Sequence, residues 1–245
     1  MSQEYSTLKF IRSRRLRGTY LDIGYGSGTY TKYFSEECET SLVLAVDGEF
    51  ERSSSVSEIL SSKSFGGSRI WCLNAYVSTK SLVYWNPRPG GEIRSFISEA
   101  KLSELSVMMN AVSIDGICNN MRSVDLIRIN TNNHELEVIK SAARTLVGKK
   151  PEICIRCGVG NEAYLIAFLR KYNYVKVKEF KNHNLYFIHV SVIGMWIISF
   201  IEHLPYSISR FIKWRRLFLE WNGFWRRRSP QLQWDAVPSG MQEIY

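Results

Sequence analysis

The stretch Tyr20–Gly28, with the sequence Y-L-D-I-G-Y-G-S-G, decides the fold of this chain. Apolar residues run into Asp22, and glycines then stand at positions 24, 26 and 28. Glycine adopts positive φ readily and lets the backbone approach a ligand closely. A helix predicted at Thr29–Glu36 would point its N-terminus at the same place, where its backbone N–H groups favour polar or anionic ligands. The stretch therefore predicts a buried first strand whose tip holds a nucleoside; a glycine-rich turn without a ligand is the alternative.

The spacing of these glycines separates two classes of nucleoside-binding protein. The dinucleotide pattern G-x-G-x-x-G would place its third glycine at position 29, which is Thr29. The D-x-G-x-G-x-G run that begins at Asp22 instead resembles the first motif of class I S-adenosylmethionine-dependent methyltransferases. A second apolar run, Leu42–Val46, ends at Asp47, 19 residues after Gly28. A carboxylate at the tip of this second strand can accept both hydroxyls of a ribose.

The rest of the chain alternates strands with helices, which predicts an α/β fold with a doubly wound, mostly parallel sheet. Seven strands are expected, at Thr19–Ile23, Leu42–Val46, Ile70–Tyr76, Asp125–Ile129, Glu152–Cys157, Val175–Phe180 and Asn184–Val190. Helices are expected at Thr29–Glu36, Ser53–Ser62, Asn133–Leu146 and Asn161–Tyr172. The segment Asn86–Glu92, N-P-R-P-G-G-E, predicts a loop between the third and fourth strands, where substrate loops lie in such folds.

Length and composition indicate one domain with appendages. The chain has 245 residues, of which 45% are hydrophobic, enough for one α/β core. We expect a basic segment at 1–18, the nucleoside-binding domain at 19–190 and an extension at 191–245. The five cysteines have no disulfide framework spacing, which favours a reducing compartment. Cys154 and Cys157 are expected to be strand residues rather than a zinc or redox pair. No apolar leader begins the chain, so we expect a cytoplasmic protein. Attachment at the periphery of a membrane is an option that depends on the segment at 192–228.

The net charge of +9 is concentrated at the two ends. Residues 1–18 hold five basic side chains against one acidic, and residues 204–245 hold seven against three. Such ends suit anionic lipid, RNA or an acidic partner, although simple solubility explains them as well. In residues 192–228, aromatic and basic side chains interleave, as in helices that lie at a membrane interface. Packing against a partner protein or a second copy, and contact with RNA, remain alternatives for this segment.

The second half of the chain resembles a known family. The segment S-V-D-L-I-R-I-N-T-N-N-H-E-L-E-V-I-K-S-A, residues 123–142, is similar to the FkbM-type methyltransferase signature V-D-L-I-K-I-D-V-E-G-x-E-L-E-V-L-K-G-A. Leu73–Ser78, Val112–Asp115 and Lys150–Ile153 are similar to shorter elements of the same family. The resemblance covers residues 18–190. It implies a Rossmann-like class I methyltransferase fold, S-adenosyl-L-methionine as cofactor and O-methylation of a hydroxyl on a glycan, lipid-linked sugar or small metabolite.

The resemblance also assigns the site residue by residue. It implies that the methionine end of the cofactor is held by Asp22, Gly24, Gly26 and Gly28. It implies that Asp47 holds the ribose, that Asn74 and Ala75 lie near the adenine, and that Asn130, His134 and Glu135 face the acceptor.

This sequence departs from the family at the functional end of the signature. Two acids of the family are Asn130 and Asn132 here, its glycine is Asn133, and its lysine is Arg128, whereas the second glutamate is retained as Glu135. An asparagine orients groups by hydrogen bonding but accepts no proton usefully. Arginine keeps the charge of lysine but not its geometry.

His134 and Glu135 are the remaining candidates for a general base. Histidine has the right unperturbed pKa range, although a solvent-exposed histidine at a helix start explains this position as well. Glu135 also suits a role in stabilising the helix N-terminus. If a metal were bound, Asp115, His134 and Glu135 could contribute ligands, but their spacing predicts no metal site.

Two further functions stay open. The altered signature and the aromatic, basic tail suit a non-catalytic subunit that binds or assembles. The basic ends suit an RNA methyltransferase of the cap 2′-O type, although the acid that its catalytic tetrad requires is replaced by Asn130.

Overall fold

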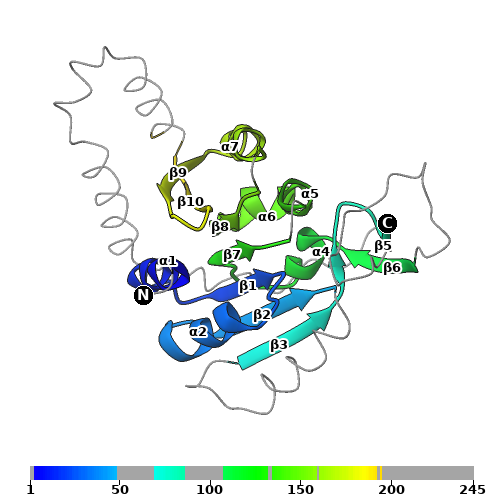
Figure 1. Cartoon of the computed structure of the whole chain (residues 1–245), viewed down its shortest axis with the longest axis horizontal. Coiled ribbons are helices and arrows are strands. Elements are labelled where there is room, and N and C mark those ends of the chain that lie inside the picture. The colour runs from blue at the N-terminus through cyan, green and yellow to red at the C-terminus, as the bar shows by residue number, and fades with distance from the viewer. Residues whose placement is uncertain are drawn as a thin grey trace, which may run out of the picture. The chain divides into compact units, whose positions relative to one another are not determined.

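A computed structural model describes residues 3–48, 69–85, 107–131, 134–158, 160–191 and Gly194. Its main sheet has seven strands in the order β3-β2-β1-β7-β8-β10-β9 (Figure 1). These strands are β1 (Thr19–Ile23), β2 (Leu42–Asp47), β3 (Arg69–Asn74), β7 (Leu126–Ile129), β8 (Glu152–Arg156), β9 (Tyr174–Glu179) and β10 (Asn184–His189). The helices are α1 (Gln3–Ser13), α2 (Thr29–Glu37), α4 (Ile114–Cys118), α5 (Glu135–Lys140), α6 (Ala143–Gly148) and α7 (Glu162–Arg170).

The pairing of the strands confirms the predicted doubly wound, mostly parallel sheet. Strands β3, β2, β1, β7 and β8 pair in parallel, and β10 runs antiparallel to both β8 and β9. All five residues of β1 are buried, as expected for a central strand covered on both faces. The carboxyl ends of β1, β2 and β7 therefore meet at one edge of the sheet.

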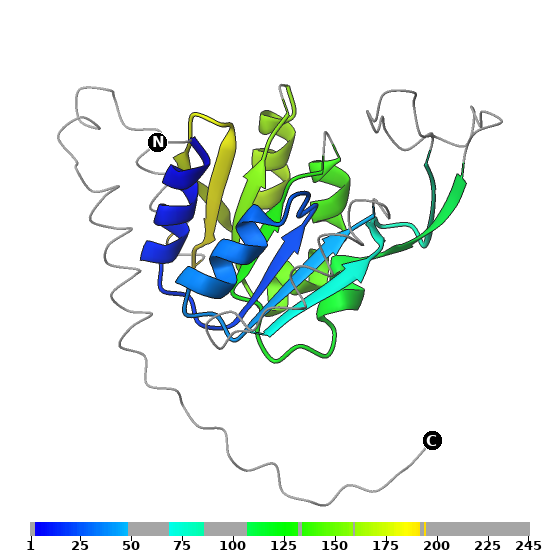
Figure 2. The same ribbon diagram turned by 60° about the horizontal axis from the view of Figure 1, so that its bottom comes forward.

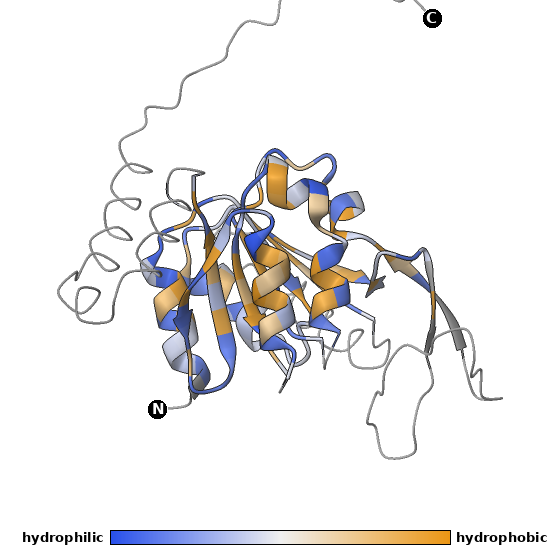
Figure 3. Cartoon of the chain, turned by 90° about the horizontal axis from the view of Figure 1, so that it is seen from above, coloured by the Kyte–Doolittle hydropathy of each residue, from blue (hydrophilic) through white to orange (hydrophobic). Residues whose placement is uncertain are grey.

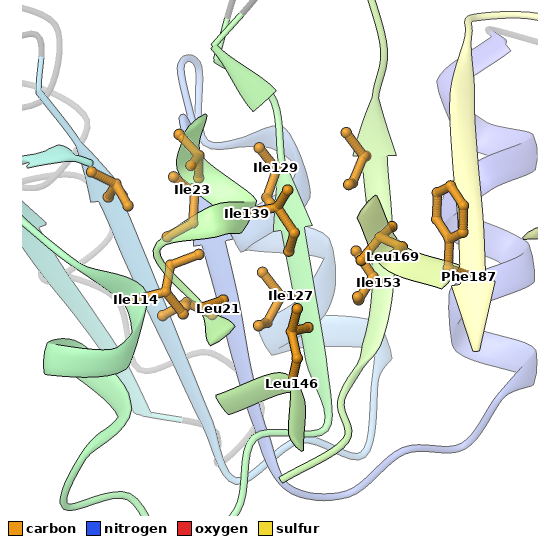
Figure 4. Packing of buried hydrophobic residues seen from close by; sticks show 14 of the residues in the cluster. Leu21, Ile23, Ile114, Ile127, Ile129, Ile139, Leu146, Ile153, Leu169 and Phe187 are labelled. Atoms are coloured by element: carbon orange, nitrogen blue, oxygen red, sulfur yellow. The ribbon is translucent and has the colours of Figure 1, made fainter. Parts of the chain in front are cut away.

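Alternate residues of β1 serve the two faces of the sheet. Leu21 and Ile23 lie in the large apolar cluster with Ile139 of α5 and Leu146 of α6 (Figure 4). Tyr20 points to the other face, where its ring meets that of Phe34 of α2 at 5.2 Å. Helices α1 and α2 cover this second face (Figure 2). Hydrophobic residues accordingly occupy the strands and the helices that cover them (Figure 3).

A second, smaller sheet was not predicted from the sequence. The segment expected to form one strand at Ile70–Tyr76 ends as β3 at Asn74, and β4 (Tyr76–Val77) begins a different sheet. There β4 pairs in parallel with β6 (Val107–Val112), which pairs antiparallel with β5 (Leu82–Trp85). Figure 2 shows β5 and β6 extending from the end of β3 away from the main sheet. The prediction of one strand was wrong because the chain changes sheets at Ala75.

The single helix predicted at Asn133–Leu146 was also wrong: the chain forms α5 and α6 with a break at Ser141–Ala142. The Ser141 hydroxyl donates to the carbonyl of Val138 at 2.7 Å and accepts from the N–H of Ile114 at 3.1 Å. The Asp115 carboxylate accepts from the N–H groups of Arg144 at 2.9 Å and Thr145 at 2.7 Å. A side chain from α4 thus caps the start of α6, so the break depends on tertiary contacts.

Helix α1, which lies within the predicted basic segment at 1–18, packs on the sheet. Leu8 and Ile11 are buried, and Arg14, just beyond the helix, donates two hydrogen bonds to the Glu152 carboxylate of β8, at 2.9 and 2.7 Å. The hydroxyl of Tyr186 donates to the same carboxylate at 2.6 Å. This buried cluster joins the N-terminal segment to β8 and β10.

Part of the sequence prediction lies outside the described residues. This holds for the helix at Ser53–Ser62, the loop at Asn86–Glu92 and nearly all of the extension at 191–245. Contacts divide the chain into two units, Met1–Val192 and Ile193–Tyr245. Within the described residues, no helix has the length and hydrophobicity to span a membrane.

Candidate functional site

Three glycines with positive φ form the turn between β1 and α2. The φ angles of Gly24, Gly26 and Gly28 are 70°, 55° and 74°. Gly28 is the residue at the N-cap of α2. L-residues with side chains rarely adopt this conformation, so the sequence prediction of glycine-specific backbone is confirmed at all three positions.

Gly24 is confined between the ends of two neighbouring strands. Its N–H donates to the carbonyl of Val46 at 2.7 Å, and the N–H of Asn130 donates to the carbonyl of Ile23 at 2.9 Å. A Cβ at Gly24 would lie 2.1 Å from the Asn130 carbonyl oxygen, whereas one at Gly26 would meet none of the described residues within 4 Å. Gly24 therefore closes the turn onto the sheet, and Gly26 borders open space in which another molecule can approach the backbone.

Asp47, at the end of β2, lies against this turn. Its carboxylate accepts from the N–H of Gly26 at 3.0 Å. Its own carbonyl accepts from the N–H of Ala75 at 3.1 Å, and Asn74 is its register partner on β3. The structure thus brings Gly26, Asp47, Asn74 and Ala75 together at the carboxyl edge of the sheet, although they are far apart in the sequence.

Asp22 has a different environment from the one expected. Its side chain has no exposed surface. Arg128 Nη1 donates to one carboxylate oxygen at 2.8 Å, and Thr31 Oγ1 donates to the other at 2.6 Å. Both oxygens are engaged within the protein on the side of the sheet that faces α2. We therefore revise the expected role of Asp22 from direct contact with a ligand to anchoring of the turn.

Arg128 completes this buried group. The same Nη1 also donates to the carbonyl of Gly24 at 3.1 Å, and the guanidinium carbon lies 4.1 Å from the centroid of the Tyr30 ring. Burial alone lowers the pKa of Arg128, but the Asp22 carboxylate raises it, and the net shift is upward. Arg128 is therefore a buried cation.

Sequence reasoning missed this ion pair, although one signal was available. Asp22 and Arg128 are register partners on the adjacent parallel strands β1 and β7. Each precedes the final isoleucine of its strand, Ile23 or Ile129, so aligning the two strand ends places both side chains on one face.

The residues expected to face the acceptor follow the end of β7. Asn130 is half-buried, and His134 occupies the N-cap of α5. Burial lowers the pKa of His134, although Glu137 opposes the shift, so the imidazole is neutral at pH 7. Glu135 is 2% exposed in the first turn of α5, where a carboxylate interacts favourably with the helix dipole. Asn132 and Asn133 lie outside the described residues.

Two other predictions concern metals and thiols. Asp115 is occupied in capping α6, and among the described residues no three His, Cys, Asp or Glu side chains gather as a metal site would need. Cys154 lies within β8, fully buried, and burial raises the pKa of its thiol to about 12. Cys157 follows the strand, where burial, with Glu135 as the largest charged contributor, raises the thiol pKa to about 11.

No family model and no curated protein matches the sequence. Among solved structures, the chain is similar to the FkbM methyltransferase of Methylobacillus flagellatus KT, with 17% identity and a TM-score of 0.53. The match covers 75% of this chain and 47% of the other, so the matched region spans about half of that protein.

Two further similar structures are a precorrin-6y C5,15-methyltransferase of Geobacter metallireducens GS-15 and an rRNA methylase of Streptococcus thermophilus. The first has 15% identity and a TM-score of 0.45, with 75% of this chain and 85% of the other covered. The second has 11% identity and a TM-score of 0.45, with 78% and 98% covered.

The similarity to the FkbM methyltransferase, together with the strand order and the turn, defines the class of fold. The chain has the class I methyltransferase fold: a Rossmann-like, seven-stranded sheet with one antiparallel strand, covered by helices on both faces. At 17% identity the likeness shows the fold alone.

Proposed function

We propose that this chain is an S-adenosylmethionine-dependent methyltransferase of the FkbM kind. The observation that carries the proposal is the pairing of three positive-φ glycines with the Asp47 carboxylate at the carboxyl edge of β1 and β2. Ligands bind at this edge in open α/β sheets. The proposed acceptor is a hydroxyl on a glycan, a lipid-linked sugar or a small metabolite.

The turn and its neighbours fit the proposed cofactor. The open space beside Gly26 lets a ligand approach the backbone, so Gly26 and Gly28 would hold the methionine end. The carboxylate of Asp47 has several acceptor sites, so it can keep its bond from Gly26 while it accepts ribose hydroxyls. Asn74 and Ala75 adjoin Asp47 and would border the adenine.

S-adenosylmethionine supplies a methyl group that is already activated as a sulfonium substituent. The protein must therefore mainly position the acceptor for in-line attack. Asn130 would orient the acceptor hydroxyl by hydrogen bonding. His134 would accept the hydroxyl proton, because its lowered pKa keeps it neutral at pH 7.

A non-catalytic binding subunit is the second candidate. The observation that favours it is the loss of the acid at Asn130, the residue that follows the end of β7. Such a protein would bind the cofactor without turnover. For the RNA alternative, the basic N-terminal segment gives less support than expected, because Arg12, Arg14 and Arg17 are each paired with a glutamate.

Methyl transfer from radiolabelled S-adenosylmethionine tests the proposal. The acceptor panel should contain glycans, lipid-linked sugars, small hydroxylated metabolites and RNA. Label in a carbohydrate or metabolite hydroxyl supports O-methylation, and label in RNA overturns the proposed acceptor class. Cofactor binding without transfer to any member of the panel favours the non-catalytic candidate.

A further inference from the structure

The buried pair of Asp22 and Arg128 contacts the glycine turn from beneath. Arg128 Nη1 donates to the Asp22 carboxylate at 2.8 Å and to the Gly24 carbonyl at 3.1 Å. One nitrogen therefore links β1 to the turn. Arg128 is 4% exposed and Asp22 is fully buried. Neither side chain therefore reaches the surface that borders Gly26.

The contacts around the pair extend to the first turn of α2. The Thr31 hydroxyl of α2 donates to the second Asp22 oxygen at 2.6 Å. The Arg128 guanidinium lies over the ring of Tyr30, which precedes Thr31 in α2. The Tyr30 hydroxyl in turn accepts from Asn184 Nδ2 at 3.1 Å. The pair thus connects β1, β7 and the first turn of α2, which are the elements that border the glycines.

We infer that Arg128 and Asp22 are positioning residues that fix the glycine turn in its ligand-binding conformation. They act through the Gly24 carbonyl and the start of α2, and they touch no ligand themselves. This inference assigns a role to Arg128 and replaces the expected role of Asp22. Its predictions about ligand affinity rest on the proposed function.

The turn requires the positive charge of Arg128 and the hydrogen bonds that its Nη1 donates to Asp22 and Gly24. Arg128 Nε is buried and has no hydrogen-bond partner within the part of the chain that the structure describes. A lysine at this position would keep a cation and a donor for Asp22 and Gly24 while removing the unpartnered N–H. Arg128→Lys should therefore preserve the turn, whereas Arg128→Met should release it and leave a buried carboxylate without its cation.

Hydrogen–deuterium exchange of the peptide that contains Gly24–Gly28 measures the turn without any ligand. Arg128→Met should speed this exchange about tenfold or more, and Arg128→Lys should stay within about threefold of the wild type. Arg14→Met is the matched control, since Arg14 also pairs with a buried carboxylate but lies against Glu152. It should speed exchange in α1 and leave the turn unchanged.

The double variant Asp22→Asn with Arg128→Met separates positioning from stability. It removes the unpaired buried charge, so it should melt at a higher temperature than Arg128→Met alone. Its turn should still exchange rapidly, and its affinity for S-adenosylhomocysteine should stay about tenfold below that of the wild type. Recovery of slow exchange together with the melting temperature would overturn the inference.

Failure of this inference and failure of the proposed function are distinguishable. If the wild type does not bind S-adenosylhomocysteine, the proposed function fails, while the exchange measurement still decides the role of Arg128. If the wild type binds and Arg128→Met binds equally well with a protected turn, the inference fails alone. Should Arg128→Met not fold, the double variant provides the same comparison.

Discussion

Gly24 and Gly26 differ in how well each position accommodates a side chain. A Cβ at Gly24 would overlap the Asn130 carbonyl, so Gly24→Ala should destabilise the protein by about 3 kcal/mol or more. Gly26 has positive φ but open space, so Gly26→Ala should cost only about 1 kcal/mol in stability. The same methyl group would stand where the ligand approaches, and the affinity for S-adenosylhomocysteine should fall about tenfold.

Urea unfolding and ligand titration together check this prediction. Gly160→Ala is the matched control, because Gly160 also has positive φ and open space but lies outside the turn. It should lose a similar amount of stability and keep its affinity for the ligand. Equal affinity of Gly26→Ala and wild type would contradict the placement of the ligand beside Gly26.

The pKa of His134 predicts the pH dependence of methyl transfer. Burial lowers this pKa below its usual value of 6.5, so the neutral, proton-accepting form is present at pH 7. Transfer rates should be flat at and above neutral pH and fall on acidification through the lowered pKa. His134→Gln should reduce the rate at pH 7 about a hundredfold and remove this acid limb.

The measurement is the pH dependence of the transfer rate for the wild type and for His134→Gln. An acid limb that persists unchanged in His134→Gln would show that another group accepts the proton. The stability of the fold should change with pH in the same direction as the transfer rate. On acidification, His134 takes up a proton in the unfolded chain before it does so in the folded chain, so stability falls as pH drops below 6.5.

Among the elements, α1 is attached by buried apolar side chains and, just beyond its end, by the ion pair of Arg14 with Glu152. Arg14 reaches Glu152, which is 1% exposed, and Tyr186 donates to the same carboxylate. Arg14→Met leaves this carboxylate without its cation and should cost about 3 kcal/mol. In a domain of this size that lowers the melting temperature by roughly 6–12 °C.

Calorimetric melting checks this expectation, with Arg17→Met as control. Arg17 pairs with Glu39, and both side chains are largely exposed, so its loss should shift melting by less than about 2 °C. Equal shifts for the two variants would argue against a specific anchor.

The elements predicted best from the sequence are those set by local patterns. The strand at Thr19–Ile23 matches β1, and the helix at Thr29–Glu36 falls one residue short of α2, because apolar runs and the glycine turn define both ends. The break between α5 and α6 was missed because Asp115, a distant residue, supplies the cap. Helix α1 was not predicted, and its ion pairs involve distant partners: Arg12 pairs with Glu37, and Arg14, just beyond the helix, pairs with Glu152.

The candidate site shows the same division. The glycines and Asp47 were identified from spacing, and the structure places them together. The engagement of Asp22 by Arg128 was not identified, since it depends on the register of strands that are about a hundred residues apart.

At the scale of the whole molecule, the segment at 192–228 carries the predicted contact with a membrane or partner protein. Apart from Gly194, this segment lies outside the described residues. We propose that it attaches the protein to anionic membrane from the cytoplasmic side, because aromatic and basic side chains interleave along it. The full chain should co-sediment with vesicles that contain phosphatidylserine and remain in solution with phosphatidylcholine alone.

Substituting Arg226, Arg227 and Arg228 by glutamine should lower the affinity for these vesicles about a hundredfold, since each basic residue contributes about 1 kcal/mol near an anionic surface. Raising the salt concentration should weaken it as well. Sedimentation with neither kind of vesicle, together with a concentration-dependent rise in mass, would favour packing against a second copy.

The central claim is that a nucleoside cofactor binds the glycine turn beside Asp47. Calorimetric titration of the purified protein with S-adenosylhomocysteine tests it most directly, with Asp47→Ala and Glu39→Ala measured in parallel. The account predicts micromolar binding by the wild type and by Glu39→Ala, and an affinity about a hundredfold lower in Asp47→Ala, which loses hydrogen bonds to a charged group. Absence of binding by the folded wild type, or equal affinity in all three proteins, would contradict it.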